Sequence, residues 1–161
     1  MRYEYFNGWH RYYREPNGPL SIEEARARHA AGVDFCTAVK GSAGNYEAFI
    51  MVCPNYFGIS FLDGLGRVYM AYGFQDAGDG RLFLSQAHVG DFSSDDDHDP
   101  YTVTSHYFKK TGATTIVHGL VGHSQREKIE TQRDVKANWE MRPTFGNYEN
   151  LLVKERGIRA S

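Results

Sequence analysis

The densest cluster of reactive side chains lies at residues 90–100, where the sequence is GDFSSDDDHDP. This stretch holds one histidine, His98, and five aspartates: Asp91, Asp95, Asp96, Asp97 and Asp99. An EF-hand calcium loop alternates its acids around a central glycine and ends in a glutamate, and that pattern is absent here. The stretch is predicted to be either a solvated loop or a loop that binds a cationic protein surface. Such a surface would relieve the repulsion among five carboxylates and steer association.

A metal site built from histidines is the next possibility. If residues 101–109 and 113–121 form a hairpin about Thr111-Gly112, His106 and His118 lie close together on neighbouring strands. A zinc site needs about three or four histidine, cysteine or carboxylate ligands. The two cysteines, Cys36 and Cys53, are distant in sequence from these histidines. The pattern favours ordinary strand histidines, so no metal ion and no cofactor are expected.

Known catalytic and phosphate-binding motifs are also absent. No serine lies in a G-x-S-x-G context, and Gly41-Ser-Ala-Gly44 lacks the Lys-Ser/Thr of a phosphate loop. The formal charge of −2 and the scattered basic residues argue against nucleic-acid binding. These observations favour a binding protein over an enzyme.

One arrangement does suggest a ligand cavity. Polar residues occupy every second position of residues 128–142, which predicts one long strand with a solvent-exposed face and a mostly apolar face. Arg133 and Trp139 fall on the mostly apolar face. Inside a curled sheet they would line an internal site together with His106 and His118. A packed core with an arginine that reaches the rim explains the same pattern.

The elements that position these residues are mostly strands. Residues 55–89 predict three consecutive strands joined by Asp-Gly-rich turns, with apolar residues alternating from Val68 to Phe74. The other predicted strands cover residues 1–13 (at an edge), 35–39, 46–53, 101–109, 113–121 and 128–142, while residues 15–19 predict a turn and residues 148–153 a short strand or helical turn.

The one clear helix covers residues 22–31. Ser21 and Glu24 form a capping-box pattern, and Gly32 follows the last helical residue. The sum is an α+β fold in a single domain spanning residues 1–161, with roughly seven to nine strands. We expect one strongly curled, mainly antiparallel β-sheet, as a half-barrel or a barrel, with the helix near the N-terminus.

Two features of the sequence bear on the cellular compartment. The N-terminus shows no leader pattern, and no segment approaches the roughly 20 apolar residues of a membrane span. These features predict a cytoplasmic protein, where Cys36 and Cys53 are expected to be reduced thiols rather than a disulfide.

The segments YFGISFLDGLGRVYMAYGF and GRLFLSQAHV resemble the sheet core of small bacterial immunity proteins of polymorphic and contact-dependent toxin systems. The similarity consists of a strand, an Asp-Gly-x-Gly-Arg turn, a second strand, and a strand that begins Gly-Arg-Leu-Phe-Leu. The resemblance implies a cytoplasmic α+β protein that binds one cognate toxin and blocks its active site. It implies no catalytic residues.

The first functional hypothesis is therefore a stoichiometric protein inhibitor whose acidic loop binds a basic toxin or effector domain. Its predicted contact residues are Asp91, Phe92, Asp95, Asp96, Asp97, His98, Asp99 and Tyr101. The alternative is a small enzyme or ligand-binding β-barrel with the internal site described above. A third hypothesis is self-association, which residues 46–53 would favour if they formed an exposed edge strand.

Overall fold

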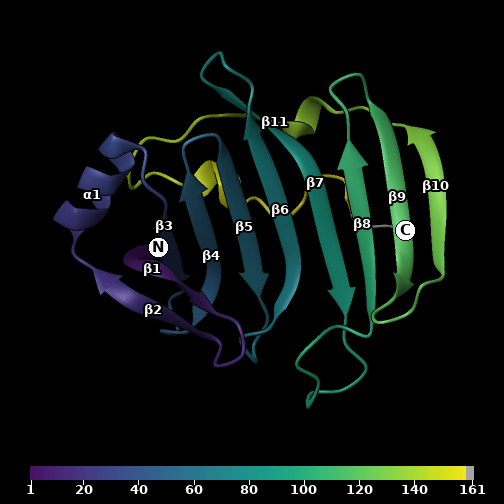
Figure 1. Cartoon of the computed structure of the whole chain (residues 1–161), viewed down its shortest axis with the longest axis horizontal. Helices are drawn as coiled ribbons and strands as arrows, with labels where there is room; N and C mark the ends of the chain where they lie inside the picture. Colours follow the sequence, from purple (N-terminus) through teal and green to yellow (C-terminus); the bar gives the residue numbers. More distant parts are fainter. Residues whose placement is uncertain (159–161) are drawn as a thin grey trace.

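The computed structural model describes residues 1–158, and its dominant feature is a single antiparallel sheet (Figure 1). Ten strands lie side by side in the order β10-β9-β8-β7-β6-β5-β4-β3-β1-β2, and β11 pairs separately with β7. The strands are β1 (Arg2–His10), β2 (Glu15–Leu20), β3 (Phe35–Lys40), β4 (Tyr46–Cys53), β5 (Tyr56–Leu62), β6 (Val68–Asp76), β7 (Arg81–Asp91), β8 (Thr102–Phe108), β9 (Ala113–Leu120), β10 (Arg126–Gln132) and β11 (Trp139–Met141).

The three-strand meander predicted over residues 55–89 is confirmed as β5, β6 and β7. The turn between β5 and β6 closes because the carboxylate of Asp63 accepts hydrogen bonds from the amides of Leu65 and Arg67. Gly66 has a φ of 75°, a conformation that glycine adopts at little cost. The predicted hairpin of β8 and β9 also forms, with His106 opposite Ile116.

The helix α1 (Ile22–Ala31) has the ends that the sequence predicts. Ser21 and Glu24 form both hydrogen bonds of the capping box, and Gly32 ends the helix in the left-handed conformation. Ala25 is its only buried residue within the described structure. This helix is too short and too polar to cross a membrane, and no other described helix could do so.

One face of the sheet is covered by the C-terminal segment, which runs behind the strands in Figure 1 and contains the short 3-10 helices η1 (Lys136–Asn138) and η2 (Glu149–Leu152). Tyr148, Leu151 and Ile158 from this segment are buried against the sheet. The hydroxyl of Tyr72 donates to the carbonyl of Lys154 at 2.6 Å. Each fully buried side chain of this size contributes about 2 kcal/mol to folding, so this covered face carries the main core.

The curled half-barrel or barrel predicted from the sequence is wrong. The sheet is a broad open layer in Figure 1, and its end strands β2 and β10 do not pair with each other anywhere in residues 1–158. It also has eleven strands rather than seven to nine. Residues 15–19, predicted to be a turn, belong to β2, because an edge strand tolerates Pro16 and Pro19 where an inner strand would not.

The predicted long strand at residues 128–142 is also wrong. Strand β10 ends at Gln132, and the chain then turns back so that β11 pairs with β7. All seven residues of β10 are exposed, so its alternating pattern does not reflect burial. The predicted edge position of residues 1–13 is wrong, because β1 lies between β3 and β2. Residues 46–53 do not form an exposed edge, since β4 lies between β3 and β5, so they give no support to self-association. Both cysteines are free thiols, as expected.

A candidate protein-binding site at one end of the sheet

Three connections meet at one end of the sheet: residues 11–14 between β1 and β2, residues 63–67 between β5 and β6, and residues 92–101 between β7 and β8. We call this region the loop end. Arg14 donates from Nη1 to the carbonyl of Leu65 at 3.0 Å, and its Nη2 lies 3.4 Å from Nδ1 of His98. The rings of Tyr12 and His98 are stacked, with centroids 5.0 Å apart. The long β7–β8 loop is therefore held against its neighbours, at the lower end of the sheet in Figure 1.

Arg67, the last residue of the β5–β6 connection, is the centre of the loop end. Its side chain is only 8% exposed. Its Nε donates to Asp63 Oδ2 at 2.9 Å, and its Nη1 donates to the carbonyls of Ser94 at 2.8 Å and Asp97 at 3.3 Å. Its guanidinium carbon lies 3.8 Å from the ring centroid of Phe92. One buried cation thus ties the β7–β8 loop to the β5–β6 turn.

The ion pair of Arg67 changes the titration of Asp63. Partial burial is the largest single influence and raises the pKa of Asp63. Hydrogen bonds from the amide and side chain of Arg67 and from the amide of Leu65 outweigh it, so the pKa is lowered overall. Asp63 is therefore held as the charged partner of Arg67 at neutral pH.

Asp97 points into the loop rather than away from it. Its Oδ2 accepts hydrogen bonds from the hydroxyl of Ser93 at 2.6 Å and from the amides of Ser93 and Ser94 at 3.0 and 2.9 Å. The Ser93 hydroxyl bond, followed by the Ser94 amide bond, lowers the pKa of Asp97. This carboxylate therefore stabilises the conformation of the loop.

The other acids of the loop face solvent. Asp95, Asp96 and Asp99 are exposed, and their carboxylates make no hydrogen bond or ion pair with any described residue. Tyr101 beside them is 56% exposed. The adjoining turns add three more exposed hydrophobic side chains, those of Tyr12, Tyr13 and Leu65. Aromatic side chains are enriched in protein interfaces, and the rim of such interfaces is polar.

The eight predicted contact residues thus divide into two groups. Phe92, Asp97 and His98 are engaged by other parts of the loop end, and Asp91 accepts a 3.3 Å hydrogen bond from the hydroxyl of Thr102. The remaining four, Asp95, Asp96, Asp99 and Tyr101, face solvent. The sequence interpretation missed Tyr12, Tyr13 and the anchor Arg67. The only sequence signal for the anchor is its position four residues after Asp63 in the turn.

The four residues predicted to line an internal site are not brought into one hollow. His106 is fully buried on the covered face and stacks on Phe108, and neither of its ring nitrogens has a hydrogen-bond partner among residues 1–158. Burial, followed by the nearby charge of Arg133, lowers its pKa. The other three residues are dispersed. Nδ1 of His118 lies 2.7 Å from Oγ1 of Thr104. Arg133 donates a hydrogen bond to the carbonyl of Gly157, and Trp139 packs on Phe83.

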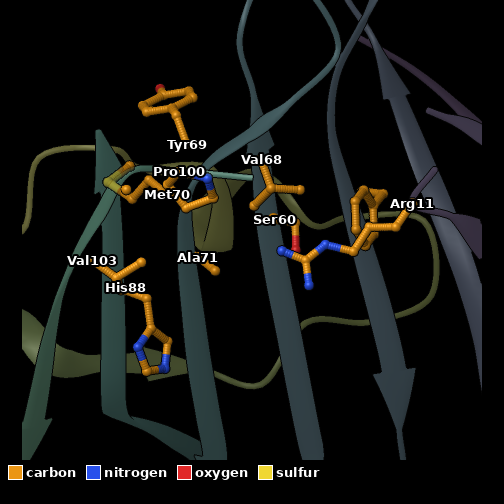
Figure 2. A pocket seen from close by; sticks show the side chains of 11 residues that line it. Arg11, Ser60, Val68, Tyr69, Met70, Ala71, His88, Pro100 and Val103 are labelled. Carbon is orange, nitrogen blue, oxygen red and sulfur yellow. The ribbon is translucent and has the colours of Figure 1, made fainter. Parts of the chain in front are cut away.

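A shallow hollow does lie on the open face of the sheet, which is the face that the C-terminal segment does not cover, and its volume is about 380 Å³ (Figure 2). The guanidinium group of Arg11 extends toward Ser60, and His88 lies on the other side of Ala71. His88 Nδ1 is 2.8 Å from Ser105 Oγ, and burial lowers the pKa of this histidine. In the described chain no third group orients the other ring nitrogen of His88, so this serine–histidine pair lacks the arrangement that activates a nucleophile.

No family model, no curated protein and no solved structure matches this chain. Within the described residues, no group of three or more histidines, cysteines, aspartates or glutamates could hold a metal ion. The loop end is therefore interpreted from its own geometry.

Proposed function

We propose that this chain is a stoichiometric protein inhibitor of the immunity-protein type, which acts in the cytoplasm and binds a cognate toxin through the loop end. The observation that carries the proposal is the anchoring of the β7–β8 loop by Arg67. This anchor leaves the carboxylates of Asp95, Asp96 and Asp99 free beside the exposed rings of Tyr12 and Tyr101. The resemblance of the meander to immunity proteins supports the same function.

The physical argument has two parts. An ordered loop loses little conformational freedom on binding, so more of its interaction free energy appears as affinity. Exposed carboxylates also steer a basic partner into place and discriminate against acidic ones. A cleft that binds an anionic substrate is itself cationic, and the loop end would occupy it by the same complementarity.

Affinity capture from the source-cell lysate at low and moderate salt, with mass spectrometry of the bound proteins, tests the proposal. The test variant carries Asp95→Asn, Asp96→Asn and Asp99→Asn. The matched control carries Glu23→Gln, Asp79→Asn and Glu127→Gln, which remove the same number of charges from exposed positions outside the loop end. We expect one basic partner in near-equal amount, retained by the wild type and the control, and lost by the test variant and by raised salt. Equal retention by all three proteins would refute the assignment of the loop end.

A second candidate function is the binding of a small organic anion in the open-face hollow. Arg11 favours it, because its cationic group stands at the rim of a mostly apolar hollow and has no ion-pair partner in residues 1–158. Ligand-observed NMR with a panel of aromatic and aliphatic carboxylates tests this function. Binding that Arg11→Gln abolishes would support it, and the absence of binding would exclude this class of ligand.

A further inference from the structure

Strand β10 is a free edge of the sheet. It pairs with β9 over all seven of its residues, from Arg126 opposite Gly119 to Gln132 opposite Ala113, without a bulge. Every one of these residues is exposed, and no described strand lies on the outer side of β10. Its outward backbone groups therefore lack a strand partner within the described chain.

The opposite edge of the sheet is protected in a way that β10 is not. Strand β2 has the sequence EPNGPL and pairs with β1 without a bulge. Because its two prolines are three residues apart, one of them lies at an outward-facing backbone position, where it has no amide hydrogen to offer a further strand. Strand β10 has the sequence REKIETQ, with neither proline nor glycine. Only one of the two edges can accept a regular partner strand.

The orientation of the free backbone groups follows from one hydrogen bond. The amide of Arg133 donates to the carbonyl of Gly112, which continues the β9–β10 register by one residue. Because successive strand residues alternate in direction, the amides and carbonyls of Lys128 and Glu130 point away from β9, and those of Ile129 point toward it.

We propose that β10 pairs antiparallel with β10 of a second copy of this chain, about a two-fold axis at Ile129. In this register Lys128 lies opposite Glu130 of the second copy, and Glu130 lies opposite its Lys128. These are the residues whose backbone groups face the edge, so both pairs are hydrogen-bonded pairs of the new ladder. A two-fold axis requires such a self-complementary surface.

Charge selects this register over its neighbours. An axis at residue 128 would place Lys128 opposite Lys128, and an axis at residue 130 would place Glu130 opposite Glu130. Like charges directly opposite each other destabilise a pair of strands, whereas opposite charges stabilise it. Among these three registers, only the axis at Ile129 gives opposite-charge pairs without placing any like charges opposite each other.

The other face of the strand supplies an apolar contact. Ile129 is 58% exposed in the isolated chain and lies beside Ile116 of β9. Pairing about the axis places the two Ile129 side chains directly opposite each other, with an Ile116 on either side. The ion pair of Lys128 with Glu130 within one strand, at 3.2 Å, is 61% and 71% exposed and contributes little to the monomer. Its charges are therefore free to pair across the axis.

Sedimentation velocity on the full chain, over a wide range of protein concentration, tests the proposal. The variants are Lys128→Glu, Glu130→Lys and the double exchange that carries both. Each single variant places like charges opposite each other twice, so we expect dimerisation at least about tenfold weaker than in the wild type. The double exchange restores opposite charges and should dimerise like the wild type.

A mixture of the two single variants provides the sharpest control. One chain then carries acidic side chains at both positions 128 and 130, and the other carries basic side chains at both, so every cross-axis pair joins opposite charges. We expect dimers in the mixture at concentrations where each variant alone is monomeric.

A wild type that stays monomeric, or dimers that the single substitutions do not weaken, would overturn the proposal. A complex with another protein that depends on residues 128 and 130, formed by a chain that is monomeric alone, would assign the edge to a foreign strand and equally overturn it.

Discussion

The β7–β8 loop and strand β10 are both highly exposed, yet they are held in place by different means. The loop has no regular secondary structure, and a buried arginine 27 residues from Ser94 in sequence fixes its backbone. Strand β10 has a regular ladder with β9, and all of its side chains are exposed. The conformation of the loop therefore depends on one side chain, whereas that of β10 depends on its backbone.

This difference has a functional consequence. Because Arg67 sets the shape of the loop from inside, its outer residues Asp95, Asp96 and Asp99 are available for a partner without affecting the fold. In β10 every side chain is available, because the ladder with β9 alone defines the strand. Substitution of the buried anchor of the loop should therefore change the free energy of unfolding much more than substitution of an exposed side chain of β10.

The largest effect is expected from Arg67→Ala. The substitution removes the ion pair with Asp63, two hydrogen bonds to loop carbonyls and the contact with Phe92. We expect the free energy of unfolding to fall by roughly 3 kcal/mol, as measured by urea denaturation at pH 7. Arg67→Lys keeps the charge without the planar fork and should fall between Arg67→Ala and the wild type. A loss below about 1 kcal/mol for Arg67→Ala would show that the loop does not depend on this anchor.

The second largest effect is expected from acid, which should lower the stability contributed by the loop end. The pKa values of Asp63 and Asp97 are lower in the folded chain than in the unfolded chain, so the unfolded state binds more protons as the pH falls. Their contribution to stability is complete above the unfolded pKa of about 3.9 and is lost as the pH falls through the lower folded values. Asp97→Asn should therefore make the acid loss of stability shallower in urea titrations between pH 2 and 6. Identical slopes for the wild type and this variant would contradict the assignment.

The smallest effect is expected in β10. Ile129→Thr keeps a β-branched side chain at a position that is 58% exposed. We expect the free energy of unfolding of the monomer to change by no more than about 0.5 kcal/mol, measured at low protein concentration. A loss well above 1 kcal/mol would show that side-chain packing, and not the ladder alone, holds this strand.

The sequence predicted the parts of the fold that depend on local patterns. The capping box at Ser21 and Glu24 and the alternation from Val68 to Phe74 are local signals, and both were confirmed. The end of β10 at Gln132 was not predictable, because the polar and apolar alternation continues into η1 and β11 although the chain changes direction. The open sheet was also missed, since strand patterns do not specify whether the end strands meet.

The site was predictable only in outline. Five aspartates within residues 91–99 identify an acidic loop, but nothing local separates Asp97, which caps the loop, from Asp95 and Asp96, which do not. That distinction depends on Ser93 and on Arg67, whose approach to the loop is a tertiary contact. The neighbouring rings of Tyr12 and Tyr13 come from a turn far away in sequence, so only the fold could place them there.

The most direct test of the central claim is the affinity for the captured partner, measured by calorimetry over a series of salt concentrations. The wild type is compared with the variant carrying Asp95→Asn, Asp96→Asn and Asp99→Asn. We predict that the variant binds roughly tenfold or more weakly at low salt, and that its affinity depends less steeply on salt. Equal affinities with equal salt dependence would contradict the proposal that the loop end binds the partner through its free carboxylates.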